Sequence, residues 1–112
     1  MSSIENNEYC IFCEIISRRE PSDIWYEDDE YIVFRNQLKW LPVMLLLVPK
    51  KHMSQQEFWG DFGRAAKLGT ELGEKFAPNG FRLLSNFGAD ALQTVKHAHL
   101  HILGGTTLGI YV

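Results

Sequence analysis

The sequence predicts an α+β fold in which a mainly antiparallel sheet of about five strands packs against one short and one long helix. Three observations lead to this fold class. Five short segments have the apolar and β-branched composition of strands, and two segments have apolar residues at helical spacing. The composition is also ordinary for a globular domain, with 46% apolar and 22% charged residues. The 112 residues contain no repeat or linker, so we expect one domain over residues 1–112.

The first half of the chain contains a predicted helix, a hairpin and a buried strand. Apolar residues in the segment 12–16 recur at helical spacing, and the helix they predict ends near Arg19. Segments 23–27 and 31–35 are rich in aromatic and β-branched residues and flank an acidic corner, which predicts a hairpin. Segment 43–48 is a continuous apolar run, typical of a strand that is covered on both faces.

Ser54 begins the one long helix of the prediction, because Glu57 three residues later completes a capping box. An apolar stripe follows, and residues 78–80 (Pro-Asn-Gly) end the helix. Gly69 and Gly73 lie in this stripe, where each costs about 1 kcal/mol relative to alanine. Such a helix is expected to approach a sheet or a second helix closely. The small residues therefore favour a homodimer, with packing on the chain's own sheet as the alternative.

Charge and hydropathy exclude several classes of protein. The formal net charge is −3, whereas a nonspecific binder of duplex nucleic acid needs a basic surface. The longest apolar run, residues 41–49, is far shorter than the roughly 18 residues of a membrane span. The N-terminal residues lack the apolar segment of a signal peptide. We therefore expect no nucleic-acid partner, no membrane partner and a cytoplasmic location, where Cys10 and Cys13 stay reduced.

Segments 81–85 and 97–103 are the last two predicted strands, and the second contains three of the four histidines. Side chains alternate faces along a strand, so His97, His99 and His101 point to one face. Burying three imidazoles is too costly for packing alone. Two functional interpretations of the three histidines remain, a metal site and a nucleophile with acid/base partners. An imidazole is a competent nucleophile toward phosphorus near neutral pH, and His99 has the other two as flanking partners, so we expect His99 to attack.

The two cysteines offer a metal site. Cys10 and Cys13 form a C-x-x-C motif, whose thiolates can share one zinc ion. Together with His52 and one triad histidine they would complete a tetrahedral set of ligands. Two alternatives stay open, a pair of reduced core cysteines and a redox pair. The redox pair is disfavoured because the motif does not follow a strand of a β-α-β unit.

A polar loop over residues 85–94 leads into the histidine segment. Its side chains Asn86, Gln93 and Thr94 are neutral donors of the kind that hold phosphate oxygens or a leaving group. An ordinary polar connection is the alternative. The position of the loop directly before three histidines favours the binding role.

With the segment His-Ala-His-Leu-His-Ile-Leu at residues 97–103, the chain resembles the histidine triad (HIT) superfamily. The segments 10–16, 47–52 and 93–95 and the pair Asn86-x-Gly88 are similar to the Hint branch in order and spacing. The resemblance implies the HIT-like fold and a homodimer. It also implies hydrolysis or transfer at the α-phosphate of purine nucleotide conjugates, of the phosphoramidate or dinucleoside polyphosphate type, through a nucleotidyl-histidine intermediate.

The resemblance also implies roles for individual residues. His99 matches the nucleophile of the catalytic triad, and His101 and the Gln93-Thr94 pair match positions that contact phosphate. Positions that match the apolar wall around the base are Ile11, Phe12, Ile15, Phe34 and Leu46. In relatives with the C-x-x-C motif a structural zinc ion is held at the positions of Cys10, Cys13, His52 and His97. The zinc and nucleophile roles therefore divide the triad between them.

The expected substrate pocket departs from the family pattern at several positions. Asn36 stands where many relatives have an acidic residue for the ribose hydroxyls, Met44 where histidine is frequent, and Leu92 where glycine is frequent beside the phosphate. Two further functions therefore stay open. One is a zinc-stabilised nucleotide-binding module of the same fold with little or no turnover. The other is a site in which the triad itself holds a reactive metal ion.

Overall fold

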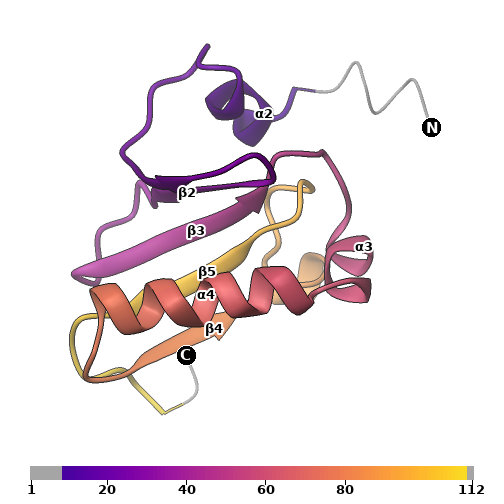
Figure 1. The fold of residues 1–112 in the computed structure, drawn as a ribbon. Helices are drawn as coiled ribbons and strands as arrows, with labels where there is room; N and C mark the ends of the chain where they lie inside the picture. Colours follow the sequence, from indigo (N-terminus) through magenta and orange to yellow (C-terminus); the bar gives the residue numbers. More distant parts are fainter. Residues whose placement is uncertain (1–8, 111–112) are drawn as a thin grey trace.

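The computed structural model describes residues 9–110 and contains one five-stranded sheet (Figure 1). The strands are β1 (Ile24–Glu27), β2 (Tyr31–Arg35), β3 (Val43–Pro49), β4 (Phe81–Leu84) and β5 (Leu100–Gly104). Their order in the sheet is β1-β2-β3-β5-β4, and every neighbouring pair is antiparallel. The predicted fold class is confirmed. The last strand of the chain lies between two earlier ones and so has a partner on each side.

The hairpin and the buried strand are formed as predicted. Asp28 fixes the turn between β1 and β2, because its Oδ1 accepts hydrogen bonds from the backbone N–H groups of Glu30 and Tyr31, at 2.8 and 2.7 Å. Every residue of β3 is buried. This strand is therefore covered on both faces of the sheet, which explains its continuous apolar run.

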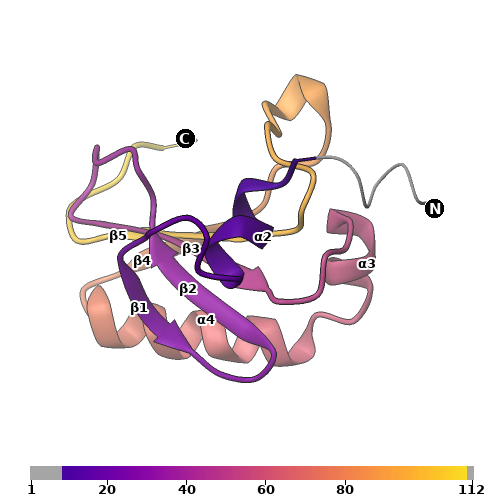
Figure 2. The same ribbon diagram turned by 90° about the horizontal axis from the view of Figure 1, so that it is seen from above.

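Helices cover both faces of the sheet. The helices are α2 (Ile11–Ile16), α3 (Gln55–Gly60) and α4 (Gly63–Phe76). Figure 2 shows α2 and α4 on opposite sides of the sheet. Ala65, Leu68 and Leu72 of α4 pack in the larger core cluster, and Phe12 and Ile15 of α2 pack in the smaller one. None of the helices in the described residues is both long and apolar enough to cross a membrane.

The first helix is shorter than predicted. It ends at Ile16, three residues before Arg19. Arg18 has φ 66°, in the left-handed region, so the right-handed helix cannot continue through it. The backbone N–H groups of Arg19 and Glu20 instead donate to the carbonyl of Glu14, which closes the C-terminal turn at 2.9 and 3.1 Å.

The single long helix predicted from Ser54 is wrong, because the segment forms two helices. Ser54 and Glu57 do form the predicted capping box at the start of α3. The helix then stops at Gly60, and Asp61 has φ −141° and ψ 68°, outside the helical region. Nothing lies within 4 Å of a Cβ built at Gly60 or Gly63, so these two glycines serve no close contact. Figure 1 shows α3 as a separate helix beyond the end of α4.

The small residues of the apolar stripe pack against the chain's own sheet. A Cβ at Gly73 would lie 2.4 Å from ring carbons of Phe81, and one at Gly69 would lie 3.0 Å from Leu100. The predicted close approach at these two glycines is confirmed, with the sheet as the partner. The stripe is therefore buried within one chain, and the homodimer stays an expectation from the family resemblance alone.

We expect Gly73→Ala to lower the free energy of unfolding by about 1–3 kcal/mol, since the new methyl group overlaps the rigid ring of Phe81. Urea denaturation monitored by circular dichroism measures this change. Gly63→Ala is the matched control, because it adds the same methyl group to the same helix in open space. A control that loses as much stability as Gly73→Ala would show that the contact with Phe81 does not matter.

Candidate functional site

Two of the triad histidines lie just before strand β5, whereas the sequence predicted a strand over 97–103. The ladder with β3 begins at the pair Leu100↔Leu47. Upstream of it, the backbone N–H of Ala98 donates to the carbonyl of Met53 at 2.8 Å, so the segment 97–99 pairs with the residues before α3 and not with a strand. The backbone bends at His97, but the rings of His97 and His99 still lie on the same side, where both contact the Phe12 ring.

The three imidazoles lie on the face of the sheet that α2 covers. The Phe12 ring of α2 contacts His97 and His99 edge-on, at centroid distances of 5.8 and 5.2 Å. The rings of His99 and His101 are 5.2 Å apart. Ala98, in contrast, belongs to the core cluster on the α4 face. The predicted common face of the imidazoles is therefore formed.

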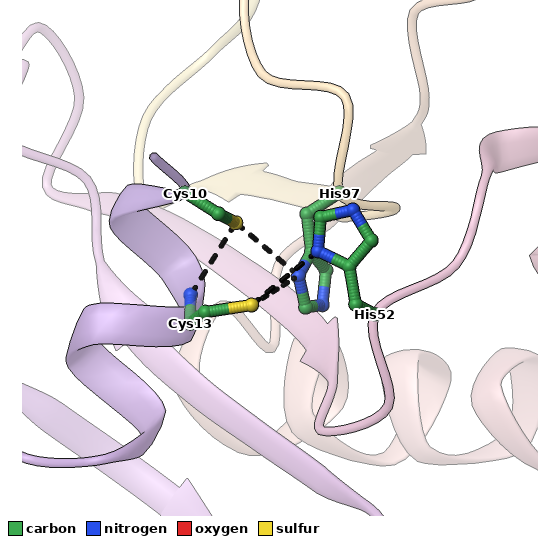
Figure 3. Close-up of side chains that lie close together, drawn as sticks. All are labelled: Cys10, Cys13, His52 and His97. Carbon is green, nitrogen blue, oxygen red and sulfur yellow. Dashed lines mark hydrogen bonds between the residues drawn. The ribbon is translucent and has the colours of Figure 1, made fainter. Parts of the chain in front are cut away.

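Cys10, Cys13, His52 and His97 meet at the N-terminus of α2 (Figure 3). One ligand atom from each lies within 4.8 Å of the others. The Sγ atom of Cys13 is 3.3 Å from Nδ1 of His52 and 3.5 Å from Nδ1 of His97, and the Sγ atom of Cys10 is 3.5 Å from the same nitrogen of His97. Two sulfurs and two imidazole nitrogens form a donor set that suits tetrahedral zinc. These four residues could hold one metal ion.

A helix cap and a carbonyl orient this cluster. The Sγ atom of Cys10 accepts the backbone N–H of Cys13 at 3.4 Å, which fixes the Cys10 sulfur at the start of α2. The Nε2 atom of His97 lies 2.7 Å from the carbonyl oxygen of Pro49. A carbonyl can only accept, so Nε2 carries the proton and the lone pair of Nδ1 faces the sulfurs. Such an outer hydrogen bond is typical of a histidine that binds a metal ion.

The protonation states of His97 and Cys13 also bear on metal binding. Burial lowers the pKa of His97 to about 4, so its ring is neutral and able to act as a ligand. Burial, followed by the neighbouring Cys10 thiol, raises the pKa of Cys13 to about 11. Both cysteines are free thiols. A divalent cation between the two sulfurs would reverse the shift of Cys13, because it stabilises the thiolates directly.

A metal ion can reach the cluster from solvent. A cavity of about 650 Å³ lies between the start of α3 and the segment 93–97, and Cys10 and His52 line it. His52 is exposed, whereas His97 is buried. The cluster therefore has an open side and a closed side.

His99 is held in a defined tautomer. Its Nδ1 atom lies 2.8 Å from the carbonyl oxygen of His97, which can only accept. The proton is therefore on Nδ1, and Nε2 keeps its lone pair. Burial lowers the pKa of His99, and the hydrogen bond to His97 opposes this shift only in part. The ring is thus neutral near pH 7, with one nitrogen available as a base or a nucleophile.

His101 has an unused polar atom beside His99. It lies in β5, where it pairs with Leu46 of β3 and Leu84 of β4. Within residues 9–110, its Nε2 is the buried side-chain nitrogen or oxygen that lacks a hydrogen-bond partner. An unpaired buried polar atom is costly, so a ligand that supplies a partner here gains affinity.

His101 also makes stability depend on pH. Burial lowers its pKa to about 4 in the folded protein, from 6.5 in the unfolded chain. Between these values the unfolded chain binds the extra proton, so the stability that His101 contributes is present above pH 6.5 and is lost as the pH falls toward 4. We expect a loss of about 3 kcal/mol through this group as the pH falls from 7 to 4. Denaturation at a series of pH values measures it. The free energy of unfolding of His101→Phe should depend less steeply on pH between 6.5 and 4. A pH dependence equal to that of the wild type would contradict the assignment.

The residues predicted to surround the base gather in one cluster. Phe12, Ile15, Phe34 and Leu46 are buried between α2 and the sheet, and Ile11 packs at their edge. The structure therefore brings all five together, and Ile11 is the one with appreciable exposure. Asn36 directly follows β2, and its Oδ1 accepts the backbone N–H of Leu38 at 2.9 Å.

The loop before the triad is braced by its own side chains. Gln93 accepts the N–H of Gly88 at 2.9 Å and donates to the carbonyl of Val95 at 3.1 Å, so its carboxamide already holds the loop together. Thr94 is exposed, and Asn86 is half-buried. Leu92 has φ 61° and is 78% exposed. This left-handed conformation is unfavourable for leucine and suits glycine, as the family resemblance suggested for this position.

One buried residue of the site was missed in the sequence. Gln55, the first residue of α3, is 1% exposed, and its carboxamide contacts the backbone of His99. It stands next to Gln56, which is exposed. Because the two residues are identical, only their different positions on the helix could have indicated that Gln55 is buried and Gln56 exposed.

Known proteins are similar to this chain over most of its length. A sequence profile of the HIT domain matches residues 17–108. A HIT-like protein from Chlamydia trachomatis (serovar D) is 36% identical over 105 residues, which cover 88% of this chain and 95% of that protein. The structure of a HIT family hydrolase from Clostridium thermocellum has a TM-score of 0.81 and 35% identity, and the match covers 94% of this chain and 97% of that one.

A further solved structure bears on the metal cluster. A zinc-bound histidine triad family protein from Mycobacterium smegmatis has a TM-score of 0.69 and 26% identity to this chain. The match covers 85% of this chain and 73% of that protein. A protein with a similar fold and sequence thus binds zinc.

Proposed function

Since the chain belongs to the HIT domain family, we propose that it is a nucleotide hydrolase or transferase of the histidine triad type. One observation carries the proposal: the Nδ1–H group of His99 donates to the carbonyl of His97, which leaves Nε2 as a neutral nucleophile. The similarity to a HIT family hydrolase supports an enzyme of this type. The substrates proposed are purine nucleotide conjugates, either phosphoramidates or dinucleoside polyphosphates.

The proposed reaction has two displacements at the α-phosphorus. The lone pair on Nε2 of His99 forms a bond to phosphorus while the bond to the leaving group breaks. The leaving group takes its electron pair and accepts a proton from solvent. Water then attacks phosphorus, releases a proton, and returns the electron pair of the P–N bond to His99. The nucleoside monophosphate is the product, or a transferred nucleotide when another acceptor replaces water.

The unpaired Nε2 of His101 supports a role in holding a phosphoryl oxygen. Thr94 and Asn86 are the further donors that we assign to the phosphate, and a positioned donor is worth about 3 kcal/mol in a transition state. We assign two roles to Gln93. Its carboxamide holds the loop together through hydrogen bonds to Gly88 and Val95, and it contacts the phosphate.

We place the base against the apolar cluster beside α2, where Ile11 offers its exposed edge and Phe12, Ile15, Phe34 and Leu46 form the layer behind. Asn36 is proposed at the ribose. The carboxamide oxygen of Asn36 already accepts the backbone N–H of Leu38. The NH₂ group therefore remains available to donate a hydrogen bond to a ribose hydroxyl.

We further propose that Cys10, Cys13, His52 and His97 bind zinc. The donor set, the orientation of His97 by Pro49 and the zinc-bound relative support this metal. When bound, zinc ties the start of α2 to the segment before β5 and serves a structural role. The reaction steps above are assigned to the other residues of the triad.

A second candidate is a nucleotide-binding module with little or no turnover. Leu92 favours it, because a strained and bulky residue occupies a loop position beside the phosphate-binding segment. In this case the nucleotide binds, but the α-phosphorus is not held in line with Nε2 of His99.

Two measurements separate the candidates. The purified protein is assayed on adenosine 5′-phosphoramidate and on a dinucleoside polyphosphate, and AMP binding is measured by calorimetry. Turnover supports the enzyme, and AMP binding without turnover supports the module. Turnover that is lost on chelation while the fold persists would instead support a reactive metal ion held by the triad.

A further inference from the structure

We propose that Gln55 is a positioning residue, whose buried carboxamide holds the backbone of the nucleophile His99 in register with the phosphate-binding loop. This inference deepens the proposed function and rests on it. It assigns a role in the reaction to a side chain outside the triad and the metal cluster.

The side-chain hydrogen bonds of Gln55 are made with two segments of the site, one containing His99 and the other Asn86. Its Oε1 accepts the backbone N–H of His99 at 3.1 Å. Its Nε2 donates to the carbonyl of His99 at 3.2 Å and to the carbonyl of Asn86 at 3.2 Å. One carboxamide thus binds both sides of the His99 peptide backbone and links it to the loop that contains Asn86.

The backbone at His99 needs these contacts because no strand supplies them. The ladder of β5 begins one residue later, at Leu100. The carboxamide of Gln55 takes the place of the missing neighbouring peptide, which satisfies the buried N–H and C=O groups of His99. The hydroxyl of Ser85 adds a further hydrogen bond to the same carbonyl at 2.7 Å.

The position of the His99 ring depends on this backbone. The Nδ1–H group donates to the carbonyl of His97, two residues earlier in the same segment. A shift of the backbone at residues 97–99 therefore changes both the direction of Nε2 and the hydrogen bond that fixes the tautomer. Displacement of a reacting atom by about 1 Å can lower a rate by roughly 100-fold.

The other end of Gln55 is fixed by the start of α3. Ser54 and Glu57 form the capping box of that helix. The carbonyl of Met53, two residues before Gln55, accepts the N–H of Ala98 at 2.8 Å. The segment 53–55 thus runs beside the segment 97–99 and gives the carboxamide a rigid base.

The test compares Gln55→Met with Gln56→Met, which makes the same change at the exposed neighbour. With adenosine 5′-phosphoramidate, we expect kcat of Gln55→Met to fall by about 100-fold and KM to change by less than about threefold. We expect Gln56→Met to keep kcat within about twofold of wild type. Nitrogen-15 NMR of the imidazoles should show only the Nδ1–H tautomer of His99 in the wild type and in Gln56→Met, and a mixture in Gln55→Met.

A second variant covers the case in which Gln55→Met does not fold. Ser85→Ala removes one hydrogen bond to the His99 carbonyl, and we expect kcat to fall by about fivefold at unchanged KM. A folded Gln55→Met with wild-type kcat and tautomer would overturn the proposal, as would an unchanged Ser85→Ala if Gln55→Met is unfolded. If the wild type itself shows no turnover, the proposed function fails, and the tautomer comparison alone decides the role of Gln55.

Discussion

Replacement of His99 by alanine is expected to lower kcat by about 10⁵-fold or more, since it removes the atom that we propose forms the bond to phosphorus. The tautomer of His99 leaves its Nε2 free to act as the proposed attacking nitrogen. In His97, Nδ1 faces the sulfur of Cys13, and Nε2 donates a hydrogen bond to the carbonyl of Pro49. The measurement is the steady-state rate on adenosine 5′-phosphoramidate.

The His99→Ala variant should keep its fold and its metal. The backbone groups that Gln55 binds are present in alanine as well, and the four cluster residues are untouched. Lys96→Ala is the control, because Lys96 is an exposed neighbour with no assigned role, and its kcat should match the wild type. A His99→Ala protein that turns over substrate at the wild-type rate would contradict the nucleophile assignment.

Replacement of His97 by alanine is expected to abolish metal binding and to lower the free energy of unfolding by about 3–5 kcal/mol. The ring is fully buried, so its loss leaves a cavity, and the carbonyl of Pro49 loses its hydrogen-bond donor. Without a fourth ligand, two thiols and the exposed His52 remain. Elemental analysis of the purified variant and chemical denaturation measure the two losses.

The variants His99→Ala and His97→Ala should therefore lose different properties of the protein. We expect His99→Ala to lose turnover but to keep its fold and its metal, whereas His97→Ala should lose the metal. His97 still offers its backbone carbonyl to His99 when its ring is removed, so its effect on turnover comes through disorder of the segment. Full metal content in His97→Ala, or an unchanged free energy of unfolding, would show that the cluster does not bind the metal as proposed.

Much of the fold could be predicted from local sequence. The hairpin and the buried run of β3 depend on composition and turn residues, which the sequence contains directly. The ends of elements depend on tertiary contacts. Strand β5 begins at Leu100 because the preceding segment pairs with residues 53–55, and the helix from Ser54 breaks at Asp61 where two glycines flank the bend.

The candidate site could be predicted where the residue type itself indicates the chemistry, as it does for histidine and cysteine. Histidines and cysteines in a known pattern indicated the metal cluster, and the structure brings those four residues together. Gln55 could not be predicted, because glutamine is common on helix surfaces and Gln56 beside it is exposed. Its importance comes from the place where the start of α3 meets the backbone of His99, and only the tertiary fold creates that contact.

The central claim is that Nε2 of His99 forms a covalent bond to the α-phosphorus of a nucleotide. Rapid mixing with adenosine 5′-phosphoramidate, followed by an alkaline quench and mass spectrometry of the digested protein, tests it most directly. We expect an adenylyl group on the peptide that contains His99 during the first turnover, and no such group in His99→Ala. Product formation without any adduct on that peptide, or with the adduct on another residue, would contradict the claim.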